Sequence, residues 1–224
     1  SSSDHVDLGQ NVNFNGDTMA ISSWIYTNMN GDRPDARVLA KTSGSSESDA
    51  YYMLGTGYSD ENEVRFRLKI GGSTDTYVTS TDPLSPSTWH HVVTTYDGSQ
   101  VRIYVDGQEE YSTSVSGDIT QSTSYNTYIG DDPNAARPWP GKIDELQLYD
   151  KALTDQDVED LYLNSANSLF NGEYDRTGIN VDSGESLSGI EVDSSNIDSS
   201  HESWARVEHS SGESEAVKLS EGNN

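Results

Sequence analysis

The 224-residue chain contains no cysteine, which excludes disulfide frameworks, thiolate zinc sites and cysteine nucleophiles together. Basic residues are scarce as well: 13 Lys and Arg stand against 38 Asp and Glu, a formal net charge of -25. Because nucleic acids and anionic membranes are both recognised through basic surfaces, neither is expected as a partner. No apolar run approaches the roughly 20 residues of a membrane helix, so no membrane insertion is expected within this chain.

The acidic excess has two interpretations. It could bind cations or cationic partners, or it could keep a salt-adapted protein soluble while salt screens the mutual repulsion of the carboxylates. The carboxylates are spread along the whole chain, which favours the second interpretation and a halophilic source. Residues 1–4 carry no signal-peptide pattern, so the chain is expected to begin after processing or inside a longer protein.

Strand patterns dominate residues 6–149. In the clearest of them, Val64, Phe66, Leu68 and Ile70 alternate with Glu63, Arg65, Arg67 and Lys69. Period two predicts that the first set faces a core and the second faces water. Two further strands, 89–96 and 101–105, each end at Asp-Gly, a strong hairpin signal. Other strands are expected at 18–26, 37–41, 51–55, 76–79, 125–130 and 142–149, and so many short strands predict an all-β sandwich or barrel.

One short helix is expected after Thr154, which can cap it, with Val158, Leu161 and Tyr162 forming its apolar stripe. The composition then shifts to Ser, Asp, Glu and Gly. We therefore expect a domain over residues 1–164 and an acidic extension over 165–224. A disordered tail is one interpretation of the extension. Short alternating runs at 189–192, 204–207 and 216–219 favour the other, in which weak strands complete the same domain.

Several segments resemble one known family in their order and spacing. They are residues 4–9 (DHVDLG), 21–25 (ISSWI), 89–98 (WHHVVTTYDG), 102–107 (RIYVDG), 128–130 (YIG), 141–149 (GKIDELQLY) and 151–154 (KALT). Over about residues 4–163 the chain is similar to the laminin-G-like, concanavalin-A-like lectin/glucanase jelly rolls. The resemblance implies a two-sheet antiparallel jelly roll, extracellular or on the cell surface, that binds a glycan or a surface protein in adhesion rather than catalysing a reaction.

The chain departs from that family at its ends. The family has a strand containing Ala-Leu-x-Phe-Asp-Gly just before the opening segment, and this chain begins too late to contain it. Residues 212–222 resemble the missing strand, with the assembly strand at about 215–220 formed by Ala216, Val217, Lys218 and Leu219. The strand could close its own domain, belong to a tandem array, or be donated to a neighbouring subunit and form a homopolymer. Coincidence is the remaining alternative.

Catalysis is not expected. Laminarinase-type relatives of the fold need Glu-x-Asp-x-x-Glu on one strand, and the nearest match is residues 142–147. Lys142 and Gln147 stand where acids are needed. A calcium-dependent, glycan-active hydrolase is kept only as a remote alternative.

Calcium is the best-motivated ion, because oxygen ligands are abundant and calcium takes six to eight of them. Asp144 shares a strand face with Leu146 and Leu148, so it is expected to point inward, where a carboxylate must be paired or metal-bound. The resemblance implies a structural calcium held by Asp144 and Asp4; the alternative is that Asp144 accepts backbone N–H bonds. Asp131 and Asp132 form a second candidate pair, although adjacent Asp residues in a loop with Pro and Asn more often face water.

Two adjacent histidines, His90 and His91, point to opposite strand faces and cannot share one ion. A His90 bonded to a neighbour is favoured over a metal ligand. For a ligand, the loop 131–140 is the most unusual stretch, because Trp139 lies between two prolines and a rigid exposed indole stacks well on sugar rings. Arg137 and Tyr58 are expected at the same rim. The alternative is that Trp139 caps the sandwich edge.

Overall fold

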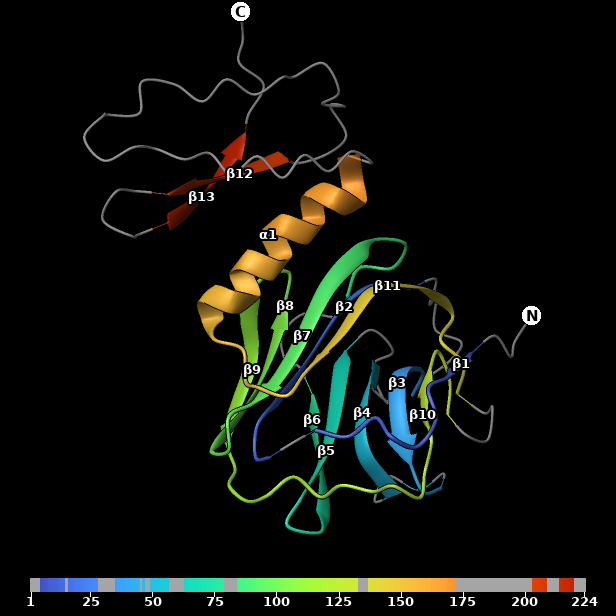
Figure 1. Cartoon of the computed structure of the whole chain (residues 1–224). Helices are drawn as coiled ribbons and strands as arrows, with labels where there is room; N and C mark the ends of the chain where they lie inside the picture. The colour runs from blue at the N-terminus through green and yellow to red at the C-terminus, as the bar shows by residue number, and fades with distance from the viewer. Residues whose placement is uncertain are drawn as a thin grey trace, which may run out of the picture. The chain divides into compact units, whose positions relative to one another are not determined.

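A computed structural model describes residues 5–14, 16–27, 35–44, 46, 49–56, 63–78, 84–132, 137–171, 203–208 and 214–219. The chain divides into two compact units, Ser1–Val158 and Glu159–Asn224. The first unit consists of two antiparallel sheets packed face to face, as Figure 1 shows. The expected all-β sandwich is confirmed.

Each sheet is built from strands that neighbour one another through antiparallel pairing. The six-stranded sheet has the order β1 (Val6–Asp7), β10 (Thr127–Ile129), β3 (Arg37–Thr42), β4 (Ala50–Thr56), β5 (Val64–Ile70) and β6 (Ser73–Val78). The five-stranded sheet has the order β11 (Gly141–Tyr149), β2 (Met19–Thr27), β7 (Trp89–Tyr96), β8 (Gln100–Val105) and β9 (Gln108–Ser114). Each strand expected from period two within residues 18–149 is present to within a few residues, and β9 completes the hairpin that Asp106-Gly107 predicted.

The core lies between the two sheets and takes side chains from both. On β4 and β5, Leu54 lies opposite Phe66 and Tyr52 lies opposite Leu68, so all four share the inward face. Ile21, Ile25, Val92 and Ile103 supply the opposing sheet, and all of these side chains are at most 1% exposed. The period-two prediction for the inward face of residues 64–70 is therefore confirmed.

A buried lysine ties the N-terminal segment to the sandwich. Lys41 on β3 is fully buried, and its Nζ donates to the carbonyls of Gln10 and Val12, both at 2.9 Å, and to Asn13 Oδ1 at 2.8 Å. Burial lowers the pKa of Lys41, and the three oxygens satisfy its donors. This single cation therefore fixes residues 10–13 against β3.

The edge strand β11 contains a bulge. Its pairing with β2 shifts between Asp144 and Gln147, and Glu145 has a left-handed φ of 46°. The extra residue changes the alternation, so Leu146 packs against the core while Asp144 is exposed. The expectation that Asp144 points inward is wrong, because the bulge separates it from the face of Leu146.

The helix α1 (Asp155–Asn171) begins as predicted with Thr154 as its cap. Thr154 Oγ1 accepts from the Asp157 N–H at 3.1 Å, and Asp157 Oδ2 accepts from the Thr154 N–H at 2.9 Å. Tyr104 on β8 donates to Asp155 Oδ1 at 2.6 Å, and Val158 is fully buried. The first turn is therefore fixed against the sandwich.

In the second unit, β12 (Ser203–Glu208) pairs antiparallel with β13 (Ser214–Leu219) in a two-stranded sheet. β13 contains Ala216, Val217, Lys218 and Leu219, and its pairing partner is β12 rather than β1. Closure of a sandwich by this strand, in its own molecule or in a neighbour, stays a prediction.

Candidate functional site

The outer face of the six-stranded sheet carries buried arginines. Arg67 lies opposite Met53, and Met53 lies opposite Ala40, so these three share the face turned away from the core. Arg67 is 1% exposed and Arg65 is 7% exposed. The expectation that Arg65 and Arg67 face water is wrong, because a layer of polar contacts covers this face.

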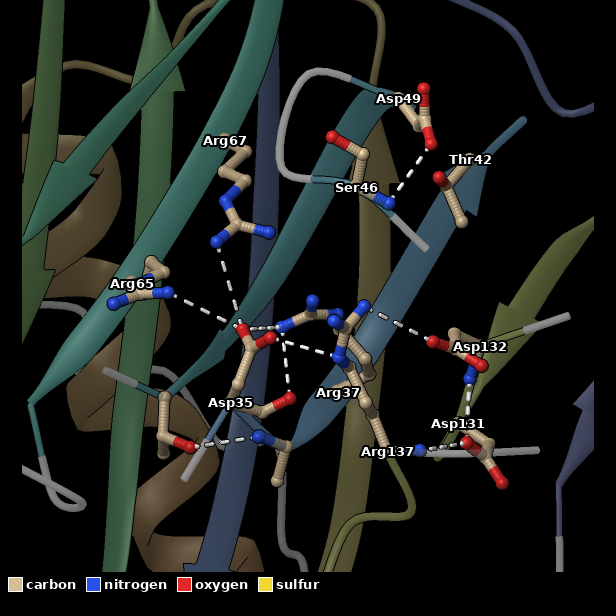
Figure 2. A network of polar contacts seen from close by, with 12 residues as sticks. Asp35, Arg37, Thr42, Ser46, Asp49, Arg65, Arg67, Asp131, Asp132 and Arg137 are labelled. Carbon is tan, nitrogen blue, oxygen red and sulfur yellow. Dashed lines mark hydrogen bonds and ion pairs between the residues drawn. The ribbon is translucent and has the colours of Figure 1, made fainter. Parts of the chain in front are cut away.

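Asp35 lies at the centre of that layer, as Figure 2 shows. Its Oδ1 pairs with Arg37 Nη1, with Arg65 Nη1 at 3.3 Å and with Arg67 Nη2 at 3.7 Å. Its Oδ2 pairs with Arg137 Nε at 2.8 Å. Asp35 is 2% exposed, so one buried carboxylate connects four guanidinium groups from three separate parts of the chain. We name these five residues the Asp35 cluster.

The backbone around Asp35 is fixed by its neighbours. Asp35 has a left-handed φ of 71°, a conformation that surrounding contacts must stabilise in a non-glycine residue. The next residue, Ala36, exchanges two hydrogen bonds with Thr56: its N–H donates to Thr56 Oγ1 at 3.2 Å, and its carbonyl accepts from the Thr56 N–H at 3.1 Å. A Cβ on Gly55 would lie 2.0 Å from the Ala36 carbonyl oxygen. Only glycine at position 55 permits this close approach.

The loop after β10 completes the cluster. Arg137 is anchored through its backbone, whose carbonyl accepts from the Arg37 N–H at 3.0 Å. Its own N–H donates to Asp131 Oδ1 at 2.9 Å, and its Nη1 lies 3.4 Å from Asp132 Oδ2. Asp131 and Asp132 are at most 2% exposed, so the alternative in which they face water is wrong.

The electrostatics of the cluster differ from those of the chain. Burial alone would raise the pKa of Asp35, but the hydrogen bond from Arg37 and the charges of Arg37, Arg137 and Arg67 outweigh it and lower that pKa. Burial is also the main cause that lowers the pKa of Arg37. Four guanidinium groups here face the carboxylates of Asp35, Asp131 and Asp132. Among the described residues, four arginines thus gather at one site in a protein with a net charge of -25.

A small pocket opens beside these arginines. Its lining consists of Arg37, Ala40, Thr42, Ser46, Ala50, Met53, Arg67 and Arg137. The space open to the centre of a water molecule is about 10 Å³, which suits one water or one small polar group. Arg137 is the predicted ligand-binding residue that the structure places here, and it is 24% exposed on its side chain. The predicted rim residue Tyr58 lies outside the described residues.

Trp139 is not at a rim. Its side chain is 8% exposed and belongs to the core cluster. The indole Nε1 lies 3.2 Å from the carbonyl oxygens of both Tyr26 and Lys142. The proposal that it stacks on an exposed sugar is wrong for this structure, and the alternative, a cap over the sandwich edge, describes its position.

The predicted metal ligands are not brought together. Asp144 Oδ1 accepts the Glu145 N–H at 2.8 Å, Asp4 lies outside the described residues, and Asp131 and Asp132 belong to the Arg137 loop. In the part of the chain that the structure describes, no group of three His, Asp or Glu side chains could hold a metal ion. Calcium therefore stays a prediction.

The two adjacent histidines have separate roles. His90 Nδ1 lies 2.7 Å from Asp106 Oδ2, which is the favoured expectation of a histidine bonded to a neighbour. His91 is 2% exposed, and its Nε2 lies 2.8 Å from Ser22 Oγ. Burial lowers the pKa of His91 to about 4, so it is neutral at physiological pH.

Sequence reasoning missed Asp35, Arg37, Arg65 and Arg67. One signal was available: the chain has only 13 basic residues, and two of them, Arg65 and Arg67, lie on one face of one strand. In a strongly acidic chain, two arginines on the same face of one strand indicate a buried partner carboxylate rather than a solvated face.

Comparisons with known proteins agree with this architecture. Among solved structures, domain 4 of AbnA, an extracellular GH43 arabinanase from Geobacillus stearothermophilus in complex with arabinotriose, is 19% identical with a TM-score of 0.53. The match covers 70% of this chain and 72% of that one. A candidate carbohydrate binding protein from Bacteroides ovatus is 21% identical with a TM-score of 0.57, over 72% of this chain and 45% of that one.

The binding domain of Paraclostridial Mosquitocidal Protein 1 is 18% identical with a TM-score of 0.51, over 67% of this chain and 37% of that one. The chain thus spans less than half of the Bacteroides and Paraclostridial chains. At these low identities, the structural similarity shows a shared fold. No curated protein matches the chain. Among the described residues, no helix combines the length and the apolar character needed to cross a membrane.

The family of the chain is established by a family model that matches its sequence. The family model described as the concanavalin A-like lectin/glucanases superfamily, Laminin_G_3, matches residues 1–159. That range contains both sheets, the Asp35 cluster and the start of α1. The chain therefore belongs to the Laminin_G_3 family of concanavalin A-like jelly rolls.

Proposed function

We propose that this chain is a non-catalytic carbohydrate-binding module, displayed outside the cell of a salt-adapted organism, whose ligand lies over the outer face of β3, β4 and β5. The observation that carries the proposal is the pocket on that face, where Arg37, Arg67 and Arg137 meet. Small-molecule sites are concave and combine apolar walls with a few placed polar groups. Ala40, Ala50 and Met53 supply the apolar part of this lining.

The comparisons support the same class of function. Domain 4 of AbnA was solved with arabinotriose, and the Bacteroides protein is a candidate carbohydrate binder. Both share the fold of this chain, and a shared fold raises the prior for a binding function without fixing a ligand. The net charge of -25 supports a salt-adapted surface.

A glycan array tests the proposal, with the purified chain applied at molar salt and at 0.15 M salt. Ser46 lines the pocket and is exposed, so Ser46→Trp obstructs the pocket without removing an ion pair. We expect at least one glycan to bind the wild type and to lose at least tenfold in affinity with Ser46→Trp. Ser124→Trp, at an exposed serine that does not line the pocket, is the matched control and leaves binding unchanged. An array on which no glycan binds would overturn the proposal.

A second function, assembly, is favoured by the edge strand β1. It is the last strand of the six-stranded sheet, and Val6 and Leu8 are 54% and 37% exposed. Unpaired edges with apolar side chains accept strands from other molecules. We propose that residues 214–219 of a second copy pair there. Light scattering at molar salt should then give a mass above one chain, and a chain ending at residue 213 should be monomeric; a monomeric full chain would overturn assembly.

A further inference from the structure

We propose that the pocket between Arg37, Arg67 and Arg137 receives the carboxylate of an acidic sugar, so that the ligand of this module is a uronate-containing glycan rather than a neutral one. The inference rests on the proposed function, because it names the class of glycan that the same site takes. It is carried by the charge of the lining, the positioning of the guanidinium groups and the size of the pocket.

The charge of the lining is opposite to that of the chain. Of the eight described residues that line the pocket, three are arginines and none is Asp or Glu. This is unexpected in a chain with 38 acidic and 13 basic residues. An anion approaching this protein is repelled by most of its surface at low salt, and this pocket is a place where the adjacent side chains attract it.

The guanidinium groups are held in place before any ligand arrives. Asp35 pairs with all three lining arginines, at 2.8 Å for Arg137 Nε and 3.7 Å for Arg67 Nη2. Arg37 and Arg67 are at most 3% exposed, so their side chains have little freedom left to lose on binding. Preorganised and partly desolvated donors bind an anion more strongly than mobile surface arginines do.

Burying Arg37, Arg65 and Arg67 is also unfavourable for their charge. Burial is the largest cause that lowers the pKa of Arg37, and Asp35 opposes that effect only in part. A bound carboxylate would offset the remaining cost of burying these positive charges.

The size of the pocket selects the group that enters. About 10 Å³ is open to the centre of a water molecule, which fits a carboxylate and excludes a pyranose ring. The ring must therefore lie outside the pocket, with its carboxylate directed inward. A planar carboxylate matches the paired donors of a guanidinium group, and a neutral hydroxymethyl group in its place gains no charge attraction.

Isothermal titration calorimetry with three matched probes tests this inference. The probes are trigalacturonate, its methyl ester and neutral arabinotriose, each titrated into the full chain at 0.15 M salt. We expect trigalacturonate to bind at least tenfold more tightly than either neutral probe. The affinity for trigalacturonate should be lower at 1 M salt than at 0.15 M salt, because screening weakens the charge attraction.

Two arginines of β5 provide a matched pair of variants. Arg65 and Arg67 both pair with Asp35 Oδ1, but only Arg67 lines the pocket. Arg67→Gln should weaken trigalacturonate binding at least tenfold, and Arg65→Gln should change it by less than twofold. A purely structural cluster predicts equal effects of the two variants. If Arg67→Gln does not fold, Ser46→Trp replaces it, because it blocks the pocket and leaves every pair to Asp35 intact.

The outcomes separate the inference from the proposed function. Equal affinities for trigalacturonate and its methyl ester overturn the acidic ligand and leave the carbohydrate-binding function standing. Tighter binding of a sulfated oligosaccharide or of a polyglutamate peptide overturns the uronate assignment. Loss of all carbohydrate binding, in the array as well as in calorimetry, overturns both.

Discussion

Arg137 Nε lies 2.8 Å from Asp35 Oδ2, and this ion pair joins the loop after β10 to the segment before β3. The same two segments are joined by the hydrogen bond from the Arg37 N–H to the Arg137 carbonyl, at 3.0 Å. One carboxylate and one backbone bond thus hold two distant parts of the chain over the outer face of the six-stranded sheet.

Asp35→Asn should destabilise the fold strongly. The substitution keeps the shape of the side chain but removes a negative charge that all four guanidinium groups of the Asp35 cluster share. Breaking a buried ion pair costs about 3–5 kcal/mol, which lowers the Tm of a domain of this size by roughly 6–20 °C. Thermal unfolding followed by circular dichroism measures the effect. Glu109→Gln is the control, because Glu109 pairs with Arg102 at an exposed position and should cost less than about 1 kcal/mol. Equal losses for the two variants would contradict the prediction.

Protonation of His91 should make the fold sensitive to mild acid. Burial lowers the pKa of His91 from 6.5 to about 4, so the unfolded chain binds a proton in a pH range where the folded chain does not. The contribution to stability is fully present above pH 6.5 and is lost as the pH falls towards 4, by about 3 kcal/mol in all.

Urea unfolding at a series of pH values measures this loss. The difference in unfolding free energy between wild type and His91→Gln should shrink by about 3 kcal/mol between pH 6.5 and pH 4. His5→Gln, at an exposed histidine, is the control for the effect of the substitution itself. A difference that is constant with pH would show that His91 has the same pKa in the folded and the unfolded chain.

Replacing Trp139 should affect stability before it affects binding. The indole is 8% exposed and packs in the core, so Trp139→Ala should cost about 3–5 kcal/mol. Trp139→Phe keeps an aromatic ring but removes the donor to the Tyr26 and Lys142 carbonyls, at a cost of about 1–3 kcal/mol. Thermal unfolding should give the highest Tm for the wild type, a lower one for Trp139→Phe and the lowest for Trp139→Ala. If Trp139→Phe stays folded and loses all glycan binding, the buried position of the indole does not describe the bound state.

Thr154→Ala should loosen the start of α1. It removes the oxygen that accepts the Asp157 N–H, and loss of such a cap costs about 1 kcal/mol. Thr154→Ser keeps the oxygen and should stay within a few tenths of a kcal/mol of wild type. Thermal unfolding distinguishes the two variants, and equal Tm values would contradict a capping role.

Period two predicted the strands because one side of each strand must be apolar. Val64, Phe66 and Leu68 are buried as that pattern required. Alternation assigns Arg65 and Arg67 to the opposite face, but it carries no information about whether that face is covered. The cover includes Asp35 and Arg137, which are distant in sequence, so the alternation of residues 64–70 does not identify it.

The candidate site was harder to predict for the same reason. Arg137 was expected to bind ligand because its loop is unusual, and the structure places it beside a pocket. Asp144 was misplaced because the bulge that follows it changes the alternation, so Asp144 and Leu146 lie on different faces of β11. Trp139 shows the remaining difficulty, since a tryptophan between prolines can serve at a rim or as a cap, and only the usual burial of large aromatics favours the cap.

The Asp35 cluster has a consequence for the folding kinetics of the protein. Its members come from before β3, from β3 and β5 and from the loop after β10, so their charges leave water together only when almost the whole sandwich has closed. Contacts that form after the transition state slow unfolding and leave the rate of folding unchanged. We therefore expect the buried carboxylate of Asp35 to slow unfolding more than it changes the rate of folding.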